Sequence, residues 1–220
     1  MSIIPIFLVA LVAIIYLETQ KTEKVFTESM TSVSTELDEN AAISTTSSSS
    51  QLSQNNSVIT PIDNAISRIT KKPFGIKVSP QDSLVQPERF SGYHTGTDFE
   101  TFENEKDKAV IVSAICSGEI IEKRKVQGYG GIIAQSCTLK DQQIIVLYGH
   151  IKLGSIKQNI GDILYAGENF AILGTGYSND TGGERKHLHL GIIKGTKLDL
   201  RGYVQSKSEL DSWIDFAKYL

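Results

Sequence analysis

The chain has 220 residues, of which 40% are hydrophobic and 21% are charged, and its formal net charge is −3. This length allows one domain of ordinary size together with additional segments. The charges after residue 59 balance to a net of +1, so the sequence lacks the basic excess that nucleic-acid binding requires. We therefore expect no nucleic-acid partner.

The first 17 residues differ from all that follow. Residues 3–17 are apolar apart from Pro5 and Tyr16, and they carry no charge. The stretch is shorter than the ~20 residues of a typical spanning helix and slightly longer than a signal-peptide core of ~7–15 residues. It lacks a basic start and a good cleavage site, so we favour an uncleaved, N-terminal apolar anchor helix over a cleaved signal segment. Either interpretation predicts that the chain is exported.

A disordered linker is predicted for residues 18–58. This stretch is rich in Ser and Thr, includes the serine run at 47–50, and has few aromatic residues after Phe26. Such a composition buries too little apolar surface to offset the entropy of the chain. The folded domain is then expected to span residues 59–220.

Short strand patterns separated by Gly, Asn and Asp dominate this domain. They cover residues 109–116, 118–126, 132–137, 142–150, 163–165, 169–173 and 187–193. Closely spaced strands of this kind favour a mainly β domain, an antiparallel sheet or sandwich with few short helices. The turn at 128–131 requires the left-handed conformations of glycine. One helix is expected at about 208–219, with Ser208 as its N-cap.

The chain has two cysteines, Cys116 and Cys137. An exported chain meets an oxidising environment, and a hairpin register could bring the two residues together, so we predict a disulfide. The alternative is a pair of small buried hydrophobic side chains. Their spacing is not the C-x-x-C spacing of a metal or redox site.

Two of the four histidines, His187 and His189, are two residues apart in a predicted strand. Residues i and i+2 of a strand share a face, so Leu188 and Leu190 would pack into the core behind the two imidazoles. Paired imidazoles on a rigid strand suit a metal site or a proton-transfer site. A half-buried strand with a polar outer face would show the same pattern.

The other two histidines lie earlier in the chain. His94 and Asp98 would meet across a glycine-marked turn, and imidazole nitrogen and carboxylate oxygen are both ordinary zinc ligands. His150 ends the strand that contains Tyr148 and Gly149.

These residues form the motifs H-x-x-x-D at 94–98, Y-G-H at 148–150 and H-L-H at 187–189. In this order, and with the glycine-marked hairpins between them, they resemble the lysostaphin-type zinc metallopeptidases over about residues 70–205. This family consists of peptidoglycan endopeptidases with a duplicated-hybrid-motif β fold. The resemblance implies one zinc ion per chain, with three ligands and two catalytic histidines. The implied ligands are His94, Asp98 and His189, and the implied catalytic residues are His150 and His187.

The function implied by the resemblance is a zinc-dependent endopeptidase that hydrolyses peptide bonds in bacterial cell-wall peptidoglycan. The enzyme would be a monomer, anchored in the cell membrane and facing the wall, or secreted if the N-terminal segment is cleaved. The alternative is a non-catalytic wall-binding module or an activator of another wall hydrolase, although the complete set of five site residues argues against it. A third alternative is a zinc hydrolase that acts on a peptide outside the wall.

The loop before the histidine pair, residues 174–186, departs from the family pattern because it is longer and more highly charged. Its charged residues would be substrate contacts or parts of a solvated loop: Asp180, Glu184, Arg185 and Lys186. Four glycine-flanked tyrosines would line the groove or, as we favour, serve in packing: Tyr93, Tyr129, Tyr148 and Tyr177.

Overall fold

The computed structural model describes residues 59–220, so the predicted N-terminal segment (1–17) and linker (18–58) lie outside the described residues. No helix among residues 59–220 is long and apolar enough to cross a membrane. The strands are β1 (Lys77–Val78), β2 (Gly92–His94), β3 (Gly96–Glu100), β4 (Ile111–Ser113), β5 (Gly118–Val126), β6 (Gly130–Leu139), β7 (Gln142–Gly149), β8 (Ile163–Leu164), β9 (Asn169–Ile172), β10 (His187–Lys194) and β11 (Tyr203–Val204). The helical segments are α2 (Ala65–Arg68) and the 3-10 turns η1 (Glu103–Glu105), η2 (Leu153–Ser155), η3 (Lys207–Ser212) and η4 (Phe216–Tyr219).

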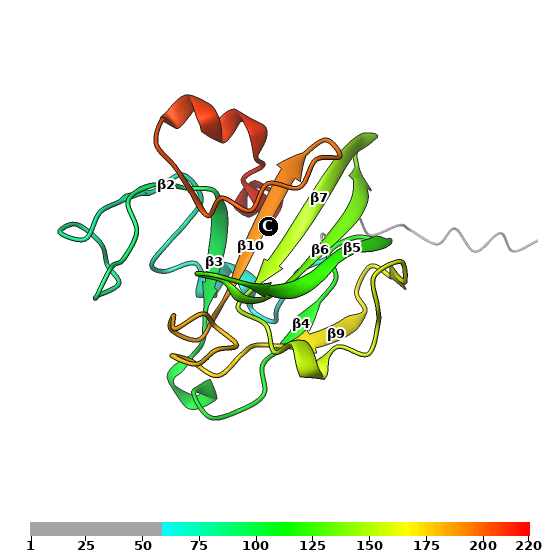
Figure 1. The fold of residues 1–220 in the computed structure, drawn as a ribbon, viewed down its shortest axis with the longest axis horizontal. Helices are drawn as coiled ribbons and strands as arrows, with labels where there is room; N and C mark the ends of the chain where they lie inside the picture. The colour runs from blue at the N-terminus through cyan, green and yellow to red at the C-terminus, as the bar shows by residue number, and fades with distance from the viewer. Residues whose placement is uncertain (1–58) are drawn as a thin grey trace, which may run out of the picture. The chain divides into compact units, whose positions relative to one another are not determined.

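The main sheet has six strands in the order β3-β10-β7-β6-β5-β8, and every neighbouring pair is antiparallel. A three-stranded sheet, β1-β2-β11, and the pair β4-β9 accompany it. Figure 1 shows β10 and β7 side by side in the middle of the main sheet, with β3 beside β10. The prediction of a mainly β, antiparallel domain with few short helices is confirmed.

The main sheet is buried on both faces because its central strands are apolar at successive positions. Ile133 and Ile144 face the larger core cluster, whereas Ile132 and Ile145 face a smaller cluster that includes Trp213. Each such side chain contributes roughly 1.5–3 kcal/mol when it is fully buried. Two packed faces therefore hold the central strands in fixed positions.

Strand β10 follows the predicted alternation. Leu188 and Leu190 are 0% and 1% exposed and belong to the larger core cluster. His187 and His189 point to the opposite face, and both are also buried, at 2% and 3% exposure. The outer face of this strand is therefore polar but enclosed, rather than half-buried and solvated.

The turn and disulfide predictions are confirmed, with one correction. Gly128 and Gly130 have φ of +84° and +68°, the left-handed region that glycine enters at little cost. Cys116 and Cys137 form a disulfide with a Cα–Cα distance of 6.2 Å. Cys116 does not end a strand, because β4 stops at Ser113 and the cysteine lies in the connection to β5.

The predicted helix at 208–219 is wrong. The segment forms η3 and η4, and Ser206, rather than Ser208, forms the capping box with Glu209. The helical segment is interrupted between η3 and η4 because this part of the chain pairs with β10. There the backbone N–H of Ile214 donates to the carbonyl of Ile192 at 2.9 Å. Trp213 is 4% exposed beside that strand, so its burial outweighs local helix propensity.

Candidate metal and catalytic site

Three predicted ligands converge on one point. The antiparallel register of β10 and β3 places His189 opposite Asp98, and His94 ends β2 next to the start of β3. His94 Nε2 lies 3.0 Å from His189 Nδ1 and 3.3 Å from Asp98 Oδ1, and His189 Nδ1 lies 3.1 Å from Asp98 Oδ1. All three side chains are buried. Two imidazole nitrogens and one carboxylate oxygen thus form a closed triangle of electron-pair donors.

This triangle fits a zinc ion. Three donors that each lie about 2.1 Å from a tetrahedral zinc are roughly 3.4 Å apart, close to the observed separations. Nitrogen and oxygen donors of these types are ordinary zinc ligands, and three protein ligands leave a fourth position open, as in catalytic rather than structural sites. His94, Asp98 and His189 are therefore able to hold the metal that the sequence motifs imply.

The chain just before β1 supports two of these residues through backbone groups. The carbonyl of Pro73 accepts a hydrogen bond from His94 Nδ1–H at 3.3 Å, so Nε2 is left unprotonated toward the triangle. The carbonyl of Lys72 accepts from the backbone N–H of Asp98 at 3.0 Å. Supporting contacts of this kind fix the tautomer and orientation of metal ligands.

His150 lies beside the triangle because β7 pairs with β10 at Gly149 and His189. It has φ of +62°, an uncommon conformation for a residue other than glycine, and its Nδ1–H donates to the carbonyl of Thr181 at 2.9 Å. Burial, together with the neighbouring His187, holds the pKa of His150 well below its ordinary value. The neutral ring therefore presents Nε2 as an acceptor at pH 7.

His187 is stacked close to His150, with ring centroids 4.2 Å apart. Its Nδ1–H donates to the carbonyl of Arg185 at 2.9 Å, and its Nε2 lies 3.2 Å from Asp98 Oδ2. Burial alone would raise the pKa of Asp98, but attraction and a hydrogen bond from His187 outweigh it and hold the pKa well below the ordinary value. Asp98 is therefore a carboxylate.

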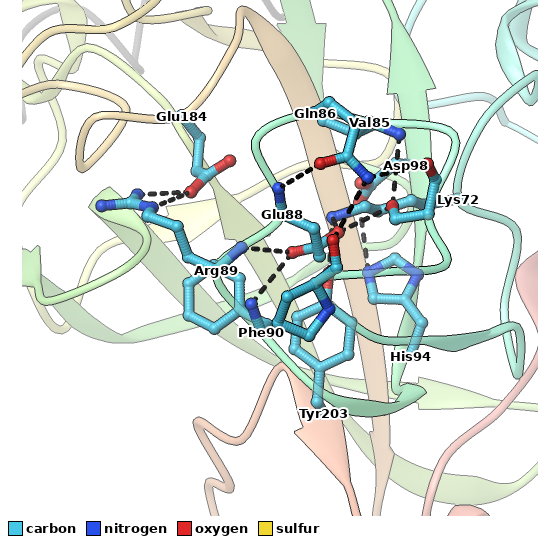
Figure 2. A network of polar contacts seen from close by, with 12 residues as sticks. Lys72, Val85, Gln86, Glu88, Arg89, Phe90, His94, Asp98, Glu184 and Tyr203 are labelled. Carbon is cyan, nitrogen blue, oxygen red and sulfur yellow. Dashed lines mark hydrogen bonds and ion pairs between the residues drawn. The ribbon is translucent and has the colours of Figure 1, made fainter.

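A cavity of ≈ 350 Å³ contains all five predicted site residues in its lining. The sequence did not predict the residues on one side of this cavity, Lys72, Phe90 and Tyr203, whose contacts Figure 2 shows. There the ammonium of Lys72 lies 2.6 Å from Glu88 and donates to the hydroxyl of Tyr203 at 2.9 Å, while Phe90 stacks on the Tyr203 ring. No motif marks these residues, because they come from segments that only the fold brings together.

Only some charged residues of the loop before β10, residues 174–186, line the cavity. Arg185 is buried and Glu184 accepts a hydrogen bond from Arg89 Nε at 3.0 Å, and both loop residues line the cavity. Lys186 does not reach it, since Nζ donates to the carbonyl of Glu105 at 2.8 Å. Asp180 lies 3.9 Å from Lys125. Of the two alternatives left open by the sequence, a place at the cavity is therefore confirmed for Glu184 and Arg185, whereas Lys186 and Asp180 do not line it.

The four glycine-flanked tyrosines also differ in whether they line the cavity or pack in the core. Tyr129 lines the cavity, with its hydroxyl 3.4 Å from His189 Nε2. Tyr148 is fully buried and its hydroxyl accepts from the backbone N–H of Ile115 at 2.9 Å, which is a packing role. Tyr93 is half-buried and Tyr177 is 74% exposed. The preference for packing is thus confirmed for Tyr148, and Tyr129 both lines the cavity and packs in the smaller core cluster.

Comparison with known proteins identifies the family to which this domain is similar. Residues 92–200, which contain all five predicted site residues, match the model of Peptidase family M23. No curated protein sequence matches the chain. Similar solved structures include the catalytic domain of the antimicrobial peptidase lysostaphin from Staphylococcus simulans, with 19% identity, 70% of this chain and 93% of that chain covered, and a TM-score of 0.46.

Two further solved structures are also similar to this chain. LytU has 23% identity, with 70% of this chain and 90% of that chain covered and a TM-score of 0.45. A zinc-containing peptidase from Vibrio cholerae has 20% identity, with 64% and 39% covered and a TM-score of 0.39. The family match spans every motif that carried the resemblance found in the sequence. The chain therefore belongs to peptidase family M23, the family of the lysostaphin-type peptidases.

Proposed function

We propose that this chain is a zinc-dependent endopeptidase that hydrolyses peptide bonds in bacterial cell-wall peptidoglycan. The observation that carries the proposal is the triangle of donor atoms from His94, Asp98 and His189, in a cavity that also contains His150 and His187. Membership of a peptidase family supports the reaction class. The complete donor set favours an enzyme over a wall-binding module or activator, which has no need of it.

Zinc bound by these residues would act as a Lewis acid on the scissile carbonyl and lower the pKa of a water molecule. His150 is suited to take the proton of the attacking water, because its Nδ1–H is held by Thr181 and Nε2 is an available acceptor. The protonated ring can then return that proton to the leaving amine. His187, directly beside it, uses its Nδ1–H on the carbonyl of Arg185, so when its ring is protonated it can donate from Nε2–H to the oxygen that gains negative charge.

The test uses the full-length protein and purified peptidoglycan. We expect about one zinc per chain, and release of wall fragments that stops with chelator and returns when zinc is added. Mass spectrometry of the fragments would identify the bond that is cut. Zinc-loaded protein that binds the wall without releasing fragments would instead indicate the non-catalytic module. Turnover of soluble peptides alone would place the substrate outside the wall.

We further propose that the enzyme is a monomer held at the outer face of the cell membrane by residues 1–17. The apolar, uncharged composition of that segment supports this location. Cell fractionation with N-terminal sequencing tests it: membrane-bound protein that retains the segment is expected. Protein in the medium that starts after residue 17 would show that the segment is a cleaved signal.

A further inference from the structure

We infer that Arg185 is a positioning residue for the proposed zinc site: it holds Asp98 so that only Oδ1 faces the ligand triangle. The inference deepens the proposed function and rests on it. Arg185 belongs to the loop that departs from the family pattern, and the sequence predicted for it either a substrate contact or a place in a solvated loop.

The two oxygens of Asp98 have different neighbours. Oδ1 faces His189 Nδ1 at 3.1 Å and His94 Nε2 at 3.3 Å. Oδ2 accepts a hydrogen bond from Arg185 Nη2 at 2.9 Å and lies 3.2 Å from His187 Nε2. A carboxylate held in this way is restrained from turning Oδ2 toward a metal at the triangle. Arg185 therefore selects which oxygen serves as the ligand.

Arg185 is itself held in place. Its Nε lies 3.0 and 2.9 Å from the two carboxylate oxygens of Glu100, and its Nη2 also contacts Glu100. Asp98 and Glu100 are two residues apart in β3 and share a face, so one planar guanidinium spans both carboxylates. Arg185 and Glu100 are only 7% and 8% exposed. The backbone carbonyl of Arg185 also accepts from His187 Nδ1–H, so one residue orients two members of the site.

Two effects of Arg185 on zinc binding have opposite signs. Its positive charge repels a cation, whereas its hydrogen bond orients the ligand. Glu100 offsets the charge, so the orienting effect should dominate. If charge were the main effect, removal of Arg185 would strengthen zinc binding. If positioning is the main effect, removal weakens it, and the sign of the change separates the two.

The experiment compares the full-length wild type with the double variant R185M/E100Q. The double variant loses one positive and one negative charge, so the net charge beside Asp98 is the same in both proteins and the effect of orientation is isolated. Zinc dissociation constants are measured by competition with a chromophoric chelator, and coordination is followed by the absorption spectrum of bound Co²⁺. We expect the double variant to bind zinc about 10–100-fold more weakly than the wild type, the usual effect of losing a supporting contact, with an altered cobalt spectrum.

Arg89→Met is the matched control. Arg89 pairs with Glu184, the residue next to Arg185, at an exposed position without contact to a ligand, so its loss should leave zinc affinity unchanged. Circular dichroism and thermal melting of the metal-free proteins report folding. If the double variant is unfolded, Arg185→Lys is the second variant, since it keeps the charge and loses the planar fork.

The outcomes are distinct. Weaker zinc binding in R185M/E100Q, or in Arg185→Lys if that variant is needed, supports positioning. Equal or tighter binding overturns the inference while the zinc site itself stands. A wild-type protein that binds no zinc would overturn the proposed function instead.

Discussion

At the scale of single residues, backbone carbonyls decide which nitrogen of each imidazole faces the site. The carbonyls of Pro73, Thr181 and Arg185 each accept from the Nδ1–H of one histidine: His94, His150 and His187, respectively. A carbonyl oxygen can only accept, so these three rings carry hydrogen on Nδ1. His189 is the exception, because its Nδ1 faces the triangle and its Nε2 faces Tyr129.

The neighbouring histidines of β10 should respond differently to substitution. His189→Ala removes one of three proposed ligands, so most of the zinc should be lost at modest chelator concentration. His187→Ala should retain about one zinc per chain, with wall-lytic turnover reduced by about 10²–10³, as for the loss of one donor to the oxygen that gains negative charge. Zinc content and lytic rate of both variants are measured. Equal zinc loss from the two would contradict the assignment.

Gly96 is required because the His189 ring lies directly against it. A Cβ at this position would lie 2.5 Å from Cε1 and Nε2 of that ring and 2.8 Å from the backbone oxygen of Leu190. Gly96→Ala should therefore displace the ring and weaken zinc binding, measured by chelator competition.

Its cross-strand partner Gly191 provides the control. A Cβ there would lie no closer than 3.5 Å to the same ring, which is ordinary contact. Gly191→Ala should bind zinc nearly as the wild type does. Unchanged affinity in Gly96→Ala would show that the ring can move aside without leaving the site.

At the scale of elements, the site depends on segments outside the part that matches family M23. Lys72 and Tyr203 flank residues 92–200 in the sequence, yet both line the cavity, and Glu88 pairs with Lys72 behind them. The ion pair of Lys72 and Glu88 is enclosed, with side chains 3% and 1% exposed. This ion pair stabilises the packing of the segment before β2 against the rest of the domain.

Breaking this pair should destabilise the protein. Lys72→Met leaves the Glu88 carboxylate buried without its ammonium partner, a change that typically costs about 3–5 kcal/mol. The double variant K72M/E88Q removes both charges, so it should lose less stability than Lys72→Met alone. Urea unfolding of the metal-free proteins measures the difference. Two variants of equal stability would show that the pair is not energetically coupled.

At the scale of the whole molecule, the enclosed histidines link folding to pH. Burial lowers the pKa of His189 from 6.5 to about 4 in the metal-free protein, and it lowers that of His150 as well. In the unfolded chain both groups titrate near ~6.5. Between pH 6.5 and 4 the unfolded state therefore binds more protons than the folded state, and acidification favours unfolding.

The free energy of unfolding of the metal-free protein should thus fall as the pH is lowered from 7 to 5. Denaturant titrations at pH 7, 6 and 5 measure it. Asp98 should contribute little to this change, because its pKa is lowered from 3.8 and its titration lies below the window. The variant H189Q should show a shallower dependence. A stability that is constant between pH 7 and 5 would contradict the argument.

The sequence alone determined the class of fold and the set of five site residues that the structure brings into one cavity. Strand periodicity is local, so the shared face of His187 and His189 and the burial of Leu188 and Leu190 followed directly from a two-residue repeat. The Gly128–Gly130 turn followed from the steric freedom of one residue type. The order of the three motifs then indicated the family.

Only the tertiary structure decided what surrounds those residues. The C-terminal segment pairs with β10 through Ile214 instead of continuing a helix, because burial of Trp213 outweighs a local propensity. The supports of the site, Lys72 and Arg185, act across large sequence separations, reaching Tyr203 and Asp98. Nothing local distinguishes a buried lysine or arginine from a solvated one. Their partners exist only once antiparallel registers have brought distant strands and loops together.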